Sequence, residues 1–125
     1  MTQARKATST DSAAVHHLER LLGGDHPTGH YHWHHVLAAV EIVTATKSAR
    51  HAALLRRIAR FDGRLALDHR HGISHAMPPE EVLRAIAIRT LAAWDGTKHA
   101  TLIRQVRDHA DHDLVALVAR DALRK

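Results

Sequence analysis

Apolar residues recur at every third or fourth position along most of this chain, which is the spacing of one face of an α-helix. Glycine and proline are scarce and fall between these segments, whereas alanine, leucine, valine and arginine dominate within them. The pattern predicts six helices, at residues 12–22, 28–45, 48–61, 80–96, 97–109 and 113–123. The fold class expected from the pattern is all-α.

Two segments lie outside this pattern. Residues 1–10 precede the first helix, and we expect a flexible tail there. Residues 63–77, "GRLALDHRHGISHAM", have no helical period and are rich in histidine, so we interpret them as an insertion. A chain of 125 residues suits one compact domain, which we place at residues 11–125.

The apolar stripes of five of the six predicted helices give an expected core. Its members are Val15, Leu18, Leu21 and Leu22; Trp33, Val36, Leu37, Val40 and Val43; His51, Leu54, Leu55, Ile58 and Phe61; Leu83, Ile86, Ala87, Thr90, Leu91 and Trp94; and Leu114, Leu117, Val118 and Ala122.

Part of the chain repeats itself after 48 residues. "RHAALLRRI" at residues 50–58 matches "KHATLIRQV" at residues 98–106 in residue type at nearly every position. The preceding helices keep the same distance, which pairs Val40 with Ile88. The first helix joins more weakly, 36 residues before the third. These matches indicate an internal repeat of a helix pair.

The last part of the chain, residues 86–125, shows a known arrangement of such a pair. An apolar helix ends near an Asp-Gly turn, a basic residue opens the next helix, and "LVALVARDAL" closes the segment after a short turn with Asp. This arrangement resembles the HEAT repeat. The resemblance implies a short right-handed α-solenoid of about three antiparallel helix pairs, which binds a protein partner along its surface or associates with itself through its ends.

Composition narrows the class of protein. The chain has no cysteine, which excludes disulfides and thiolate metal sites and is compatible with a reducing cytoplasm. It has no apolar run of about 18 residues and no signal-peptide pattern near its start, so we expect a soluble, cytoplasmic protein that does not bind membranes. No phosphate-binding loop or nucleophile elbow is present, so the sequence favours a non-enzymatic binding or adaptor protein over an enzyme.

Positive charge provides the first candidate site. There are 18 lysines and arginines against 13 acidic residues, a formal net charge of +5, and most of the cations are arginine. Six arginines fall on the polar side of the third and fifth helices or in the loop after the third, and we name them the basic ridge: Arg56, Arg57, Arg60, Arg64, Arg104 and Arg107. Such a ridge can be a solvated helix face, a surface for an acidic protein, or a track for the phosphates of a nucleic acid.

Histidine provides the second candidate site, because the chain has 14 of them. In "GHYHWHH" at residues 29–35, His30 and His34 are four apart, a spacing that lets two imidazoles on one helix bind a divalent transition metal. The metal ligands predicted on this basis are His30, His34, Asp68, His69, His71 and His75. The alternative is that these imidazoles are solvated or cover the apolar stripe.

Two other histidines occupy equivalent places in the repeat. His51 and His99 each begin the apolar stripe of a helix. A role that recurs in each repeat indicates packing or hydrogen bonding at a helix end rather than chemistry. The carboxylates of "DHADHD" at residues 108–113 are likewise interpreted as helix caps in a turn.

Overall fold

The structure is a computed structural model in which residues 2–23, 31–61, 67–68, 78–110 and 113–124 are described, with side chains described for 11–23, 32–61, 78–110 and 113–124. Its helices are α1 (Thr2–Gly23), α2 (Trp33–Ala45), α3 (Ala49–Arg60), α4 (Pro79–His109) and α5 (Asp113–Leu123). Two short strands, β1 (Tyr31–His32) and β2 (Leu67–Asp68), pair in parallel. The described part of the chain is thus built almost wholly from helices, which confirms the all-α class.

Helix α4 consists of two helical segments that meet at Asp95. The backbone there leaves the helical region (φ −164°, ψ 87°), which separates residues 79–94 from residues 96–109. The Lys98 amide donates a hydrogen bond to Asp95 Oδ1 at 3.1 Å, so the carboxylate caps the second segment. The helix end predicted at Trp94-Asp95-Gly96 is therefore confirmed, and the six predicted helices correspond to six helical segments.

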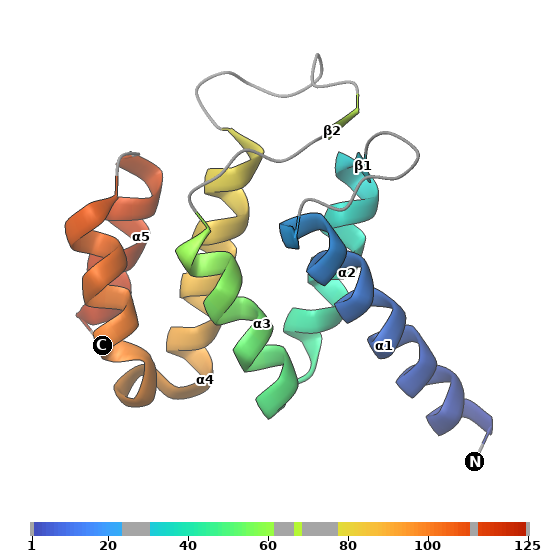
Figure 1. The fold of residues 1–125 in the computed structure, drawn as a ribbon. Helices are drawn as coiled ribbons and strands as arrows, with labels where there is room; N and C mark the ends of the chain where they lie inside the picture. The colour runs from blue at the N-terminus through green and yellow to red at the C-terminus, as the bar shows by residue number, and fades with distance from the viewer. Residues whose placement is uncertain (1, 24–30, 62–66, 69–77, 111–112, 125) are drawn as a thin grey trace.

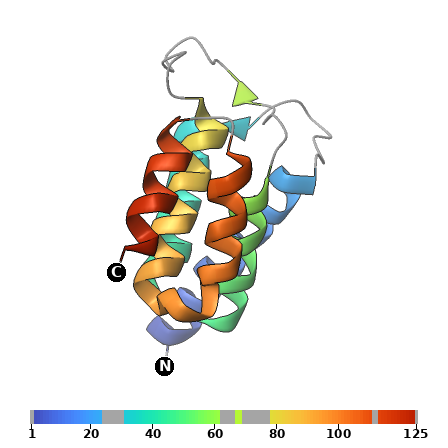
Figure 2. The same ribbon diagram turned by 90° about the vertical axis from the view of Figure 1, so that its left-hand side faces the viewer.

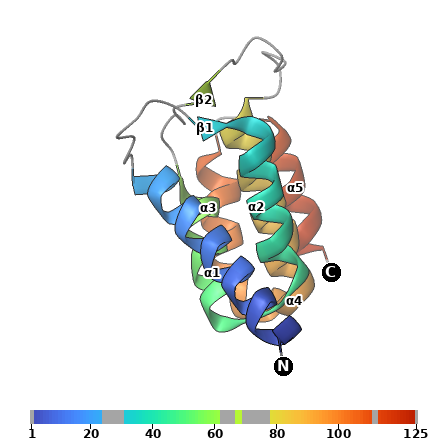
Figure 3. The same ribbon diagram turned by 90° about the vertical axis from the view of Figure 1, so that its right-hand side faces the viewer.

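The helical segments form two layers, and successive segments alternate between them (Figures 1, 2 and 3). Helix α1, helix α3 and residues 96–109 make the first layer, which faces the viewer in Figure 1. Helix α2, residues 79–94 and helix α5 make the second layer. Contacts join α1 to α2, α3 to α4 and α4 to α5, with further contacts of α1 with α3 and of α2 with α4.

The core between the layers follows the repeat of 48 residues. In the second layer, Val40 and its repeat equivalent Ile88 are both buried. In the first layer, Leu54 and its repeat equivalent Leu102 are also buried. Packing therefore treats residues 33–60 and 81–108 as equivalent units, as the sequence match predicts.

The first helix fits the repeat at a slightly different distance from the one predicted. Its buried Leu18 and Leu21 take the places of Leu55 and Ile58, which are 37 residues further along. At the predicted distance of 36, Leu21 would correspond to the exposed Arg57. The burial pattern thus moves the register of α1 by one residue.

Two helices begin at other residues than predicted. Helix α1 starts at Thr2, so residues 2–10, expected as a flexible tail, are helical; no glycine or proline interrupts them. Helix α2 starts at Trp33 rather than near residue 28. The reason is that Tyr31 and His32 are extended and pair with Leu67 and Asp68 of the insertion. At Tyr31 and His32, backbone pairing takes the place of the predicted helix.

The last helix also buries a different face from the predicted stripe. Val115 and Ala119 are buried, whereas Leu114, Val118 and Ala122 are only half-buried. Leu117, predicted to be in the core, is 61% exposed. Helix α5 packs against α4, and its buried face carries the small residue Ala119.

Candidate functional site

The basic ridge lies on the first layer of the fold. Arg56, Arg57 and Arg60 come from α3, and Arg104 and Arg107 come from residues 96–109, the next helix of the same layer. Arg64 lies outside the described residues. The structure therefore brings together on one layer the members of the ridge that it describes.

Three of these arginines line a pocket of about 410 Å³ beside the end of α1. Its other lining residues are Leu22 of α1, Ala53 of α3 and Phe61, which follows α3. Leu22 and Phe61 are half-buried and pack against the core, so they add apolar surface to the pocket that the three arginines line. We name this the arginine pocket: Leu22, Ala53, Arg56, Arg57, Arg60 and Phe61.

Arg56 is held in place by a buried histidine of the neighbouring repeat. Its Nη1 lies 3.0 Å from His99 Nδ1, and His99 is only 3% exposed. A guanidinium can only donate hydrogen bonds, so Nδ1 of His99 accepts and the ring proton lies on Nε2. Burial, followed by the nearby Arg56 and Lys98 cations, lowers the pKa of His99 below its ordinary value of 6.5, although Asp95 opposes this shift. The imidazole is therefore a neutral acceptor that orients Arg56.

The other arginines of the ridge differ in their partners. Arg57 Nη1 lies 3.8 Å from Glu19 of α1, and Arg107 Nε lies 3.0 Å from Asp108. Within the described residues, the guanidinium groups of Arg60 and Arg104 have no hydrogen-bond or ion-pair partner. Both are exposed, so they are the cations of the ridge most available to a ligand.

A hydrogen bond joins the turn between α2 and α3 to the turn at Asp95 within α4: Lys47 Nζ donates to the Trp94 carbonyl oxygen at 2.9 Å. At the first of these turns, His51 Nδ1 lies 2.6 Å from the carbonyl oxygen of Thr46, the C-cap residue of α2. The contact between His51 and Thr46 confirms the helix-end role predicted for His51. Lys47, Trp94 and His99 also line a cleft of about 370 Å³ between the two turns.

Most of the side chains predicted as metal ligands lie outside the part of the chain that the structure describes. Helix α2 begins at Trp33 and contains His34, whereas its partner in the spacing argument, His30, is not among the described residues, so their pairing stays a prediction. The ring centroids of His34 and His35 lie 4.2 Å apart, and that of His32 lies 5.7 Å from His34 and 5.4 Å from His35. His30, His69, His71, His75 and the side chain of Asp68 lie outside the described residues. Among the side chains that are described, no group of three or more could hold a metal ion.

The insertion nevertheless approaches the histidine-rich segment. The parallel strand pair places the backbone of His32 opposite that of Asp68. Helix α1 contributes His17, whose pKa is lowered by burial and then by the His35 and Arg20 charges. These imidazoles gather where α1, α2 and the insertion meet.

Sequence reasoning missed one buried charge that joins the repeats. Arg84 is buried, and its Nε donates to the Ala59 carbonyl oxygen in the last turn of α3 at 3.1 Å. Its Nη1 lies 3.2 Å from Glu81 Oε2. The repeat places Arg84 at the position of the buried Val36, so a charged residue at a core position was the available signal.

None of the helices that the structure describes is long and apolar enough to cross a membrane. No family model, curated protein or solved structure matches this chain. The resemblance to HEAT repeats therefore stays a prediction, and function has to be argued from the surfaces of this chain.

Proposed function

We propose that this chain is a non-enzymatic binding protein that holds an acidic segment of a protein partner in the arginine pocket. It acts as a short, right-handed, HEAT-like solenoid whose first layer is the binding surface. The observation that carries the proposal is the arginine pocket itself, where Arg56, Arg57 and Arg60 line the same pocket as the apolar residues Leu22 and Phe61. The absence of cysteine is compatible with the cytoplasm, where we expect the protein to work.

The composition of the pocket suits a peptide that carries both carboxylates and an apolar side chain. Guanidinium groups bind carboxylates through paired hydrogen bonds, and an apolar anchor adds affinity by leaving water. Arg56 is oriented beforehand by His99, so less side-chain freedom is lost when a ligand binds. Arg60 supplies an exposed cation without a competing partner among the described residues.

The same surface is less suited to nucleic acid, the other anionic partner considered from the sequence. A phosphate backbone binds best along a continuous track of cations. Here the carboxylates of Glu19 and Asp108 interrupt the row by pairing with Arg57 and Arg107. An acidic protein segment, which needs only a local cluster of cations, fits the arrangement better.

The test uses a fluorescent peptide of about a dozen residues, rich in Asp and Glu around one central Leu, and measures binding by anisotropy. Arg60→Glu should weaken binding at least about tenfold, because it places a carboxylate beside the acidic ligand. Arg120→Glu is the matched control, since Arg120 is exposed on α5 in the other layer and the change in net charge is identical. It should change affinity by less than about threefold.

Three outcomes would count against the proposal. Equal weakening by the two substitutions would show that only net charge matters. Unchanged affinity after the central Leu of the peptide is replaced by Ser would show that the apolar wall plays no part. Tighter binding of a DNA duplex, with affinity falling by several powers of ten per tenfold rise in salt, would favour the nucleic-acid alternative.

A further inference from the structure

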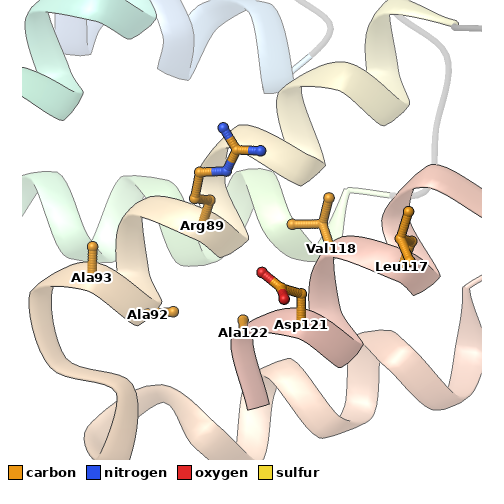
Figure 4. Close-up of a pocket in the computed structure, with 7 residues that line it drawn as sticks. All are labelled: Arg89, Ala92, Ala93, Leu117, Val118, Asp121 and Ala122. Carbon is orange, nitrogen blue, oxygen red and sulfur yellow. The ribbon is translucent and has the colours of Figure 1, made fainter. Parts of the chain in front are cut away.

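The second layer carries a groove that the proposed function does not use. It has a volume of about 350 Å³ and lies between α5 and the first segment of α4 (Figure 4). It is lined by Arg89, Ala92 and Ala93 of α4 and by Leu117, Val118, Asp121 and Ala122 of α5. The arginine pocket is on the other layer, so the two surfaces are separate.

The α5 side of the groove exposes an apolar side chain that the helix pattern predicts to be buried. Leu117 is 61% exposed, and among the described residues it is the large hydrophobic residue that lies open to solvent. The α4 side opposite is lined by Ala92 and Ala93, which leave space rather than fill it. One wall is therefore an apolar projection and the other is a shallow apolar surface.

The charges of the groove are divided in the same way. Arg89 stands on the α4 wall and Asp121 on the α5 wall, and both are exposed. Within the part of the chain that the structure describes, neither side chain has an ion-pair partner. Each wall thus carries one charge of opposite sign that is available to another molecule.

We infer that this groove binds the same groove of a second copy of the chain, around a twofold axis. In a twofold interface, each contact between one residue of the first copy and another residue of the second copy forms twice, the second time with the two copies exchanged. The α4 wall of one copy would then face the α5 wall of the other. Leu117 would pack on Ala92 and Ala93, and Arg89 would pair with Asp121, twice over. The complementarity of the two walls in charge and in shape is the reason for choosing a second copy as the occupant.

The expected association is weak. A stable interface usually buries about 800 Å² on each partner. That is about a tenth of the 7819 Å² surface of this chain, more than one groove of seven residues supplies. We therefore expect a dissociation constant of about 10–100 µM and a monomer–dimer equilibrium rather than an obligate dimer.

The decisive test is charge reversal followed by mixing, with mass measured by sedimentation equilibrium up to about 500 µM chain. Arg89→Asp alone places carboxylates at both positions, and Asp121→Arg alone places guanidinium groups at both. Each single variant should dimerise at least about tenfold more weakly than the unchanged chain. An equimolar mixture of the two variants should dimerise like the unchanged chain, because both cross-copy pairs are then of opposite sign.

A second substitution tests the apolar contact. Leu117→Ala should raise the dissociation constant of the dimer about tenfold. Ala116→Gly, a change at the neighbouring position of α5, is the control for an effect of helix stability on the dissociation constant. An unchanged chain that stays monomeric throughout the concentration range would overturn the inference. Single charge-reversal variants that dimerise as well as the unchanged chain would also overturn it. A mixture of the two variants that stays monomeric would overturn it as well, because Arg89 and Asp121 would then not pair between two copies.

Discussion

Alanine substitution at Leu54 and Leu102 tests whether the two repeats carry equal weight in the core. The two side chains are 3% and 2% exposed and lie 48 residues apart in equivalent positions of the first layer. Truncation of a buried leucine removes apolar contact and leaves a cavity, so each change should lower the unfolding free energy by about 2–5 kcal/mol. Unfolding entropy is about 2.1 cal/mol/K per residue, so for this chain of 125 residues a loss of 3 kcal/mol corresponds to about 11 °C.

The assay is thermal unfolding followed by circular dichroism, at low micromolar concentration so that self-association does not contribute. Leu117→Ala is the matched control, because the same atoms are removed from a residue that is 61% exposed. It should cost less than about 1 kcal/mol. A melting temperature that is unchanged for either buried leucine would refute the equivalence of the repeats. A loss at Leu117 as large as at Leu54 would refute the position of α5.

Two further predictions concern the buried polar groups. Arg84→Met should destabilise the fold by about 1–3 kcal/mol in urea unfolding, because the Ala59 carbonyl oxygen loses its donor; full stability in the variant would show that this link is dispensable. Because the pKa of His99 is lower in the folded chain, the unfolded chain binds the proton more tightly, and stability should fall as the pH drops below 6.5. His99→Asn keeps a hydrogen-bond acceptor for Arg56 and should reduce the change of the unfolding free energy with pH. His17, whose pKa is also lowered in the folded chain, should account for part of the change that remains.

The sequence specified the helices well because their signals are local. The Asp-Gly turn at Asp95, the proline at the start of α4 and the apolar period of α3 all act within one or two turns of helix. The repeat distance of 48 was equally visible, since equivalent positions such as Leu54 and Leu102 face the same core. These features need no knowledge of distant neighbours.

The failures have a common cause in contacts between distant segments. The start of α2 depends on pairing of Tyr31 and His32 with residues of the insertion, which no local period reveals. The buried face of α5, with Val115 and Ala119, depends on how this helix packs against α4. The arginine pocket was foreseen only as a row of cations, because its apolar wall comes partly from Leu22 of a different helix.

The alternation of helices between two layers gives the two proposed surfaces a physical relation to each other. Association through Leu117 on the second layer would leave the arginine pocket of each copy, on the first layer, open to solvent. A dimer would therefore present two pockets held at a fixed separation. A partner with two acidic segments would bind both pockets, and the second contact would form at a high effective concentration, raising the apparent affinity without any new contact. A partner with one acidic segment would gain nothing from the dimer.

The test compares the affinities of a one-segment and a two-segment peptide, each measured with the unchanged chain and with the Arg89→Asp variant. This comparison separates the contribution of the groove from that of the pocket. Equal affinities for the two peptides at concentrations where the unchanged chain is dimeric would show that the pockets act independently.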